Sequence, residues 1–500
     1  MNITTALSEH AKSRPYDLAL ITLTEKYDWF SLNDKVNRTA SFLAARGVVA
    51  GQRCAISVRD QVLHLFVSVA LARLGVSQIA LPPIDPMAIR QSLVSRLNIE
   101  VVVVESLKEG ALQKTRGIEI SSALIDLEVA STDPTHLCDG DEPFLILQSS
   151  GTTGSPKFSE LSHRMAFERF TRYKTYFGTS EHDICWPASR LDFVVAKQRA
   201  FHCLQSGAAL CIVSGRVIDE CLLNFLDRTG VTLGVGSPSH MIQILAASRR
   251  SLSLPKLRAF EVRSATINET LRRDFMTRVS PGLFVAYATN EMEVATLATP
   301  ENLRQVVDTV GLPVTGMSVE VVDSEDEVVP NGTAGSIRIA GKGVIDGYLD
   351  DPGSTCKSFR NGWFYPGDIG RFVDGQLVFL GRSDDMMIYD GMNIYPIEIE
   401  NALMQHPSVR EVAALPLKHQ KFQDVPVAAV VLKSPTNLNE LQAHCELTLG
   451  LKQPRMLMIL ESLPTNAMGK TLKREIAKMF HTAASKQYGT QFELAGWKFQ

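Results

Sequence analysis

One short segment constrains this 500-residue chain more than any other. Residues 143–147 form an apolar run of strand length that is bounded by turn-forming residues. After Gln148 comes an unbroken run of hydroxyl and glycine residues: Ser149, Ser150, Gly151, Thr152, Thr153 and Gly154. Such residues cannot pack a core, but they expose backbone N–H groups and small hydroxyls that suit polyphosphate oxygens. Lys157 adds a positive charge, so the segment predicts a phosphate-binding loop after a strand.

The glycine spacing of this loop differs from the Walker pattern, which has four residues between its glycines and a lysine directly after the second. Here two residues separate Gly151 from Gly154, and Pro156 precedes Lys157. Taken alone, the segment is also compatible with a flexible Ser/Gly linker.

Bulk properties exclude several other classes of protein. The length predicts two or more domains, and 45% hydrophobic with 21% charged residues is typical of a soluble globular protein. A formal net charge of −3 argues against a general nucleic-acid or anionic-membrane binder. We expect no membrane span and no signal peptide, because long apolar runs and a basic N-terminal region are missing. Eight scattered cysteines without a CxxC motif predict reduced thiols and a cytoplasmic protein.

The pattern of apolar runs changes along the chain. Up to about residue 320, helix-like segments alternate with short β-rich runs, which predicts parallel α/β layers. From about 315 to 381, short alternating strands with turns at Asn331-Gly332 and Asp374-Gly375 predict a small antiparallel subdomain. After Gly381 the pattern becomes α+β, so we expect a domain boundary near Asp384.

Four further stretches share a pattern with the 147–157 loop. They are Tyr-Ala-Thr-Asn-Glu at 287–291, Trp-Phe-Tyr-Pro-Gly-Asp at 363–368, Gly-Arg-Ser-Asp at 381–384 with Gly-Met-Asn-Ile-Tyr-Pro-Ile-Glu-Ile-Glu at 391–400, and Pro-Thr-Asn-Ala-Met-Gly-Lys at 464–470. In this order they resemble the motifs of the adenylate-forming superfamily, which comprises acyl- and aryl-CoA synthetases, peptide-synthetase adenylation domains and luciferases. The resemblance covers roughly residues 145–480, and stretch 391–400 is most similar to the CoA synthetases.

The resemblance implies a role for each motif in the first reaction step. The Ser/Thr/Gly loop and Lys157 hold the phosphates of ATP. Tyr287 stacks on adenine, Thr289 reaches the α-phosphate, and Glu291 holds Mg²⁺. Ser264 lies in the stretch that corresponds to the family's adenine-side segment.

Other motif residues are implied to bind the ribose, move the C-terminal domain or admit a thiol. Asp368 accepts hydrogen bonds from the ribose hydroxyls, and Arg382 contacts the nucleotide. Asp384 is the pivot between two domains. Gly391 leaves space for the pantetheine arm of coenzyme A, and Lys470 neutralises charge on the carboxylate and the α-phosphate.

The chain departs from the family pattern at several positions. Ala288 and Ser264 replace usual glycines, and Pro366 replaces a common threonine. Residues 186–207, where the family places contacts to the acid, are not recognisable in detail. Asp192 in this region is either a contact to a substrate amine or, as we favour, a surface charge or an internal ion pair.

The resemblance implies an α/β protein with a large N-terminal domain, residues 1–383, that binds AMP. That domain comprises two α/β subdomains to about residue 315 and a small β-barrel-like subdomain at about 315–381. A mobile C-terminal α+β domain, residues 384–500, carries Lys470. The implied activity is that of an ATP-dependent acid–thiol ligase, an AMP-forming acyl-CoA synthetase that uses ATP, Mg²⁺ and coenzyme A. The alternatives are an adenylation enzyme that loads a carrier protein and a non-catalytic adenylate-binding protein.

Overall fold

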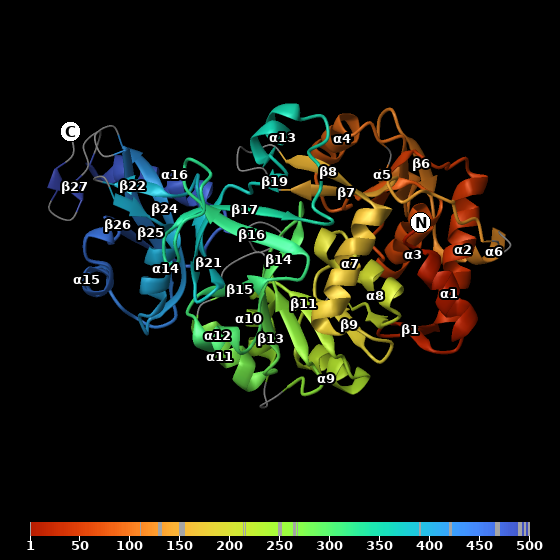
Figure 1. Ribbon diagram of the computed structural model, residues 1–500, viewed down its shortest axis with the longest axis horizontal. Coiled ribbons are helices and arrows are strands. Elements are labelled where there is room, and N and C mark those ends of the chain that lie inside the picture. The colour runs from red at the N-terminus through yellow and green to blue at the C-terminus, as the bar shows by residue number, and fades with distance from the viewer. Residues whose placement is uncertain are drawn as a thin grey trace.

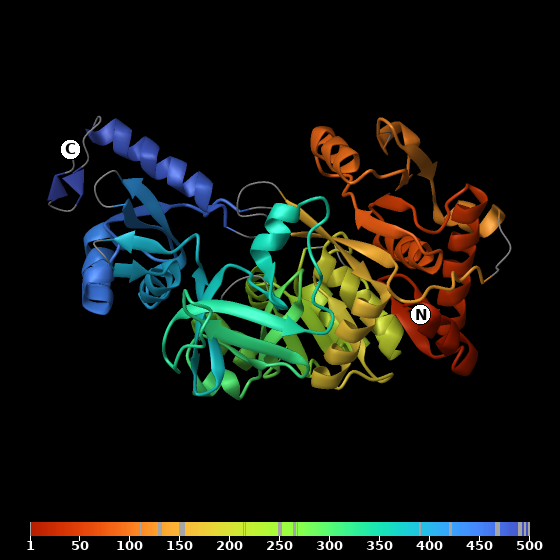
Figure 2. The same ribbon diagram turned by 45° about the horizontal axis from the view of Figure 1, so that its top comes forward.

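The computed structural model is shown in Figure 1. It describes residues 2–110, 112–128, 133–149, 156–213, 215, 217–248, 253–263, 267, 269–389, 392–419, 423–465, 471–488, 493–494 and 497–498. The N-terminal elements, red and orange, lie at one end of the molecule and the C-terminal elements, blue, at the other (Figures 1 and 2). The yellow and green elements between them join the two ends.

A six-stranded sheet is built from the N-terminal part of the described chain. Its strands are β3 (Arg53–Ser57), β4 (Ser77–Ala80), β5 (Val101–Val104), β6 (Arg116–Glu119), β7 (Pro143–Ser149) and β8 (Lys157–Ser162). In the order β6-β5-β3-β4-β7-β8, all neighbours are parallel except β7 and β8, which form an antiparallel pair. The four valines of β5 are all buried, as expected for a parallel strand covered on both faces.

The second sheet contains fifteen of the described strands. They are β1 (Leu18–Ile21), β2 (Lys26–Asp28), β9 (Ile184–Pro187), β10 (Ala209–Cys211), β11 (Leu233–Gly236), β12 (Ala259–Val262), β13 (Leu283–Thr289), β14 (Glu293–Ala298), β15 (Thr309–Pro313), β16 (Met317–Val322), β17 (Gly335–Gly341), β18 (Phe359–Arg360), β19 (Trp363–Phe364), β20 (Asp368–Val373) and β21 (Gln376–Arg382). The order is β18-β19-β17-β20-β21-β15-β14-β13-β12-β11-β9-β10-β1-β2, with β16 on β17. The neighbouring strands β13, β12, β11, β9, β10 and β1 pair in parallel in this order. The pairs β13–β14, β14–β15, β15–β21, β20–β21 and β16–β17 are antiparallel.

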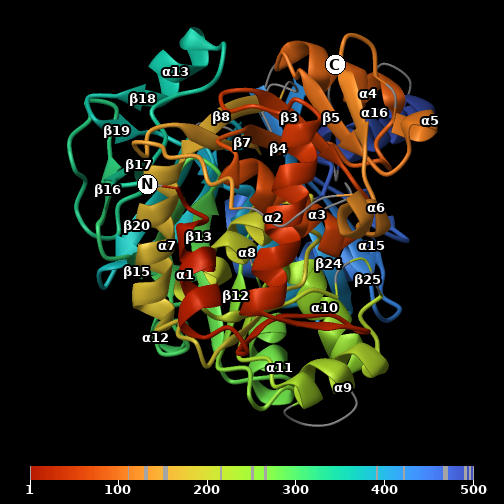
Figure 3. The ribbon, with the colours of Figure 1, turned by 90° about the vertical axis from the view of Figure 1, so that its right-hand side faces the viewer.

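Helices cover these sheets and separate them. They are α1 (Thr5–Ser13), α2 (Trp29–Ala45), α3 (Gln61–Arg73), α4 (Met87–Arg96), α5 (Leu107–Gly110), α6 (Ser122–Glu128), α7 (His163–Phe177), α8 (Val194–Ser206), α9 (Glu220–Thr229), α10 (Pro238–Ala247), α11 (Glu269–Arg278), α12 (Asn302–Gln305) and α13 (Pro352–Ser358). Helix α8 contacts both sheets, because its Phe201 ring lies 5.1 Å from that of Phe144 in β7 and its Arg199 pairs with Glu261 in β12 at 3.0 Å. Figure 3 shows α2 and α3 side by side at the N-terminal end.

The predicted turn at Asp374-Gly375 is present. Both residues have positive φ, +49° and +75°, and they join β20 to β21 as a two-residue hairpin. Positive φ at both central positions is what a type I′ turn requires, and Asp-Gly supplies it at small steric cost. The turn sets the pairing from Val373–Gln376 to Gly370–Phe379, and a β-bulge between Ile369 and Gly370 then shifts the register by one residue, so that Asp368 lies opposite Arg382.

The C-terminal segment is α+β, as expected. It contains β22 (Met387–Tyr389), β23 (Met392–Ile394), α14 (Pro396–Met404), β24 (Val409–His419), β25 (Gln423–Leu432), α15 (Leu438–Leu449), a 3-10 turn (Gly450–Lys452), β26 (Met456–Leu460), α16 (Lys473–Tyr488), β27 (Glu493–Leu494) and β28 (Trp497–Lys498). Strands β24, β25 and β26 form a sheet that shares a hydrophobic core with α14 and α16. Asn401 of α14 donates a hydrogen bond to Asp308 at 2.7 Å, which connects this segment to the preceding part of the chain.

Several of the predicted site segments follow the carboxyl ends of parallel strands. In the six-stranded sheet this is the end of β7, and in the fifteen-stranded sheet these are the ends of β9, β12 and β13. Open α/β sheets bind ligands at the carboxyl ends of their strands. Among the described residues, no helix has the length and apolar character needed to cross a bilayer. The predicted α/β architecture is confirmed, while a boundary at Asp384 stays a prediction.

Candidate nucleotide site

Three of the predicted site residues meet at the start of β20. Tyr287, near the end of β13, donates its hydroxyl hydrogen bond to a carboxylate oxygen of Asp368. Arg382, at the end of β21, donates from Nη1 to Oδ1 of Asp368 at 3.0 Å and from Nε to Asp384 at 3.2 Å. Residues separated by some 80 positions in sequence thus form one polar cluster.

Burial dominates the electrostatics of this cluster. Asp368 is 4% exposed, and burial raises the pKa of its carboxyl above the ordinary aspartate value although Arg382 lowers it. Burial and then the neighbouring carboxylate raise the pKa of Tyr287 well above its ordinary value. Burial lowers the pKa of Arg382, but Asp368 and then Asp384 more than offset this and raise it. A buried carboxylate with one neutral and one cationic donor is suited to accept hydrogen bonds from a diol.

A second cluster lies in the turn between β13 and β14. The carboxylate of Glu291 accepts a hydrogen bond from the Tyr348 hydroxyl at 3.0 Å. The Thr289 hydroxyl is buried and has no hydrogen-bond partner among the described residues. Asn290 donates to the carbonyl oxygen of Gln148 at 2.6 Å, which ties the turn to the end of β7.

The ends of the predicted phosphate loop lie beside this turn. Ser149 and Lys157 are paired in the β7–β8 ladder, so they bring the two ends of the loop together. The Lys157 ammonium lies 4.6 Å from the centre of the Tyr348 ring, the same ring whose hydroxyl contacts Glu291. The structure therefore brings Ser149, Lys157, Thr289 and Glu291 to one edge of the sheets.

Several predicted site residues lie outside the described part of the chain. They are Ser150, Gly151, Thr152, Thr153, Gly154, Ser264, Gly391 and Lys470. Their roles stay predictions.

The described residues fit a magnesium-bound nucleotide. Mg²⁺ prefers oxygen ligands, takes one or two protein carboxylates and keeps several waters. Glu291 offers such a carboxylate. The Thr289 hydroxyl has no hydrogen-bond partner among the described residues, so it can donate to an oxygen of a ligand. A buried polar group without a partner is costly, so this hydroxyl indicates a ligand position.

Asp192 forms an internal ion pair with Arg190. Its side chain is 4% exposed, and Oδ2 lies 2.6 Å from Nε of Arg190. Oδ1 lies 3.6 Å from Nδ1 of the buried His64. The nearby Lys197 is buried, its ammonium has no hydrogen-bond partner among the described residues, and burial lowers its pKa to about 8.

Three further residues hold the turn at Glu291 and belong to none of the sequence motifs. They are Tyr348 and two arginines of α7, Arg169 and Arg172. Tyr348 follows Gly347 in an irregular segment, and no spacing rule singles it out. The arginines did leave a signal. They share the helix face of the apolar residues Ala166 and Tyr173, where a solvent-facing arginine is not expected.

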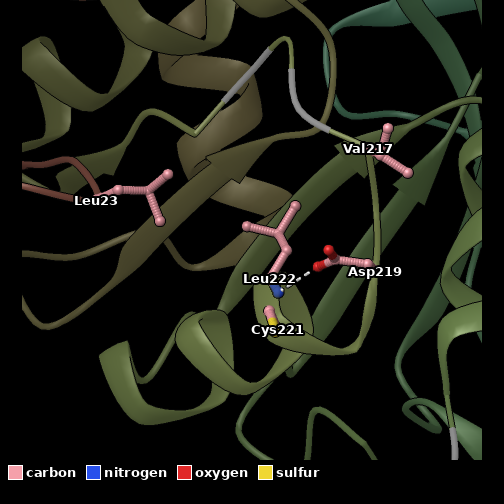
Figure 4. Close-up of a pocket in the computed structure, with 5 residues that line it drawn as sticks. All are labelled: Leu23, Val217, Asp219, Cys221 and Leu222. Atoms are coloured by element: carbon pink, nitrogen blue, oxygen red, sulfur yellow. Dashed lines mark hydrogen bonds between the residues drawn. The ribbon is translucent and has the colours of Figure 1, made fainter.

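A surface hollow elsewhere contains none of the predicted site residues (Figure 4). It is lined by Leu23, Val217, Asp219, Cys221 and Leu222. The carboxylate that lines it caps α9, because Asp219 accepts a hydrogen bond from the Leu222 N–H at 2.8 Å. The hollow is therefore not a candidate for the nucleotide site.

Comparison with known proteins adds three findings. The sequence profile of the AMP-binding enzyme family matches residues 7–349, and that of the AMP-binding enzyme C-terminal domain matches residues 398–470. The chain is 26% identical to 2-succinylbenzoate–CoA ligase of Bacillus licheniformis, over 94% of this chain and 98% of that protein. It is 28% identical to feruloyl-CoA synthase of an Amycolatopsis species, over 95% of this chain and 97% of that protein. Its fold matches that of ATP-bound MatB from Rhodopseudomonas palustris with a TM-score of 0.89 at 23% identity, over 96% and 98% of the two chains.

Proposed function

The chain belongs to the AMP-binding enzyme family, and from this we propose that it joins a carboxylic acid to coenzyme A at the expense of ATP. It is an AMP-forming acid–thiol ligase of the adenylate-forming superfamily. Its substrates are a small-molecule carboxylic acid, ATP with Mg²⁺, and coenzyme A. The names of the two relatives, both CoA-linked, support the choice of thiol.

The reaction has two steps. In the first, a carboxylate oxygen attacks the α-phosphorus, an O–P bond forms, and the α–β phosphoanhydride bond breaks to release pyrophosphate. In the second, the thiol sulfur attacks the acyl carbon, a C–S bond forms, and AMP leaves with the carboxylate oxygen while the thiol proton goes to solvent. The first step depends mostly on positioning and on neutralising charge.

Each described residue of the site has a defined task in the first step. Lys157 supplies positive charge beside the triphosphate, and Thr289 donates its free hydroxyl to a phosphate oxygen. Asp368 accepts hydrogen bonds from the ribose hydroxyls, with its orientation set by Tyr287 and Arg382. Glu291 would hold the magnesium ion, which when bound neutralises phosphate charge.

The observation that carries this proposal is the convergence of three separate segments on one edge. The β7–β8 loop ends, the β13–β14 turn and the β20–β21 strands meet through Tyr348, Asn290 and Asp368. Phosphate, metal and ribose groups of one nucleotide need such contacts in this order along the ligand.

The C-terminal segment would take part in both steps. Lys470 would approach the reacting oxygens during the first step, and in the second Asp384 would be the pivot and Gly391 would leave a path for the pantetheine arm. A domain boundary at residues 383–384 follows from this arrangement. Among the described residues no disulfide joins two cysteines, and reduced thiols support a cytoplasmic location.

A carrier-protein-loading enzyme is the second candidate, since it shares the first step and differs only in the thiol. Loading of a phosphopantetheinyl carrier without turnover of free coenzyme A would favour it.

A screen of acids tests the proposal. Purified protein is incubated with Mg·ATP and fatty, aryl, dicarboxylic or amino acids, with and without coenzyme A, and pyrophosphate and AMP are measured. We expect one class of acid to release pyrophosphate and to release AMP rapidly only with coenzyme A. Pyrophosphate release that coenzyme A never accelerates would contradict the ligase assignment and favour the carrier alternative.

A further inference from the structure

Arg169 of α7 is a fully buried arginine directed at the turn that carries Glu291. Its Nη2 donates to the carbonyl oxygen of Glu291 at 2.8 Å, and its Nη1 donates to that of Asn290 at 3.1 Å. Its Nε donates to the carbonyl oxygen of Gly343 at 2.7 Å. One guanidinium thus holds three backbone carbonyls that come from two separate segments, β13–β14 and the chain after β17.

Arg172, one turn later on α7, repeats this arrangement. Its Nη2 donates to the carbonyl oxygen of Met292 at 3.1 Å, and its Nη1 donates to that of Lys342 at 2.7 Å. Gly343 has a φ of +79°, and a Cβ placed on it would lie 3.1 Å from Cγ of Arg169. The segment at 342–343 therefore lies directly against α7, and the two arginines connect it to three consecutive carbonyls of the turn.

The turn itself is held in an unfavourable conformation. Glu293 has a φ of +63°, which a non-glycine residue rarely adopts. Its buried carboxylate lies 2.9 Å from Nη2 of Arg263 and 3.7 Å from Nη2 of Arg172. Ion pairs of this kind fix a strained backbone, because the conformation persists only where the surroundings determine it.

We propose that Arg169, assisted by Arg172, is a positioning residue for adenylation: it fixes the backbone of the turn so that Thr289 and Glu291 face the magnesium-bound triphosphate. This inference rests on the proposed function of Glu291 and extends it to α7. The effect of the two arginines passes through the carbonyl oxygens that they hold.

The chemistry of the guanidinium explains why arginine occupies this position. Its planar fork offers five N–H donors, whereas a lysine ammonium is a compact charge that cannot span two carbonyls in one plane. Burial lowers the pKa of Arg169 to about 9, so the group stays cationic at neutral pH. Lysine at this position therefore keeps the charge and loses the geometry.

The test compares Arg169→Lys with a matched control, Arg258→Lys. Arg258 also donates to two backbone carbonyls, those of Phe177 and Gly178, but it lies at the amino end of β12, the opposite edge of the sheet. Three quantities are measured for each variant: the Kd for Mg·ATP without acid by calorimetry, the rate of pyrophosphate release, and the rate of thioester formation from preformed acyl-AMP. Thermal unfolding shows whether each variant folds.

We expect Arg169→Lys to weaken Mg·ATP binding and to slow pyrophosphate release by on the order of tenfold to a hundredfold, the scale of small misplacements of reacting groups. Thioester formation from acyl-AMP and the KM for the acid should stay within about twofold of wild type. Equal losses in both half-reactions, wild-type binding of Mg·ATP, or the same loss in Arg258→Lys would overturn the proposal.

Two other results are possible: the variant does not fold, or the wild-type protein releases no pyrophosphate. If Arg169→Lys does not fold, Arg172→Lys replaces it, and a selective loss of Mg·ATP affinity in that variant supports the proposal while its absence overturns it. If the wild-type protein releases no pyrophosphate with any acid, the proposed reaction fails, whereas the binding measurement still decides whether Arg169 positions the turn.

Discussion

Asp368 occupies a position that costs stability. Burial raises the pKa of its carboxyl, so the folded state binds this proton more tightly than the unfolded chain does. The stabilisation that comes from the bound proton is present below the unfolded pKa and is lost as the pH rises through the folded pKa. At neutral pH the buried carboxylate is therefore a net cost, and this residue is better explained by ligand binding than by folding.

Asp368→Asn should separate these two effects. We expect the Kd for ATP to rise by about tenfold or more, because a charged hydrogen bond is worth about 1.5–3 kcal/mol. The free energy of unfolding at pH 7 should not fall, and any advantage of the variant should disappear as the pH is lowered through the carboxyl pKa. Calorimetric titration with ATP and urea unfolding at pH 7 and pH 4 measure both. Parallel loss of binding and stability at pH 7 would show that the carboxylate is structural.

Lys197 is a buried cation whose charge costs stability, as the buried carboxylate of Asp368 does. It is 3% exposed, and burial lowers its pKa from 10.5 to about 8. The unfolded chain thus binds more protons between about pH 8 and 10.5, so the wild-type protein gains stability as the pH rises through this range. The gain is lost as the pH falls through 8.

Replacing this lysine by methionine removes a buried charge while keeping the apolar stem. We expect Lys197→Met to raise the free energy of unfolding at pH 7 by up to about 3 kcal/mol, from the pKa shift to about 8. The difference should shrink at pH 9.5, as measured by urea unfolding at both pH values. Lys174→Met, at an exposed position of α7, is the control and should show no such dependence. A pH-independent difference for Lys197→Met would contradict this account.

At the scale of elements, the β20–β21 hairpin connects the nucleotide site to the predicted pivot. A β-bulge between Ile369 and Gly370 shifts the register that the Asp-Gly turn sets and places Asp368 opposite Arg382, which in turn contacts Asp384. We therefore expect any rotation of the C-terminal segment to begin after Arg382.

Substitution at the pivot should separate the half-reactions. Asp384→Pro fixes φ and removes a backbone N–H, whereas Asp384→Ala removes only the carboxylate. We expect the proline variant to release pyrophosphate at a rate within about threefold of wild type and to form thioester at least about tenfold more slowly, the scale of a lost conformational step. The alanine variant should retain both rates. Rapid-quench measurement of each step decides, and wild-type thioester formation in the proline variant would place the hinge elsewhere.

Some of these elements could be predicted from the sequence, and others could not. Buried strands such as β5 and the hairpin turn at 374–375 were predictable because their signals are local. Helix α2 begins at Trp29 because Asp28 caps it, with its carboxylate accepting a hydrogen bond from the Ser31 N–H. The contacts of Arg169 with the turn were not predictable, since the residues are 121 and 122 positions apart and only the fold joins them.

The sequence likewise indicated only some residues of the candidate site. Tyr287, Asp368 and Arg382 could be grouped from motif order, and the structure brings them together. Asp192 could be read two ways, and only the packed neighbour Arg190 shows that it is an ion pair. Tyr348 was missed because its contact with Glu291 depends on an irregular segment.

At the scale of the whole molecule, we expect the two half-reactions to use different arrangements of the C-terminal segment. Lys470→Ala should slow adenylate formation by about a hundredfold, as expected for removing a preorganised charge from a transition state. Thioester formation from preformed acyl-AMP should be nearly unchanged. Single-turnover assays of each step test this, and equal loss in both would show that the lysine is structural.

Transfer of an isotope from the acid to AMP shows whether the reaction passes through an acyl adenylate. The acid found by the screen is labelled with ¹⁸O in both carboxyl oxygens and incubated with Mg·ATP and coenzyme A, and the released AMP is analysed by mass spectrometry. We expect one ¹⁸O in each AMP, because the oxygen that attacks the α-phosphorus leaves with the nucleotide. Thioester formed together with unlabelled AMP, or with a product other than AMP, would contradict activation through an acyl adenylate.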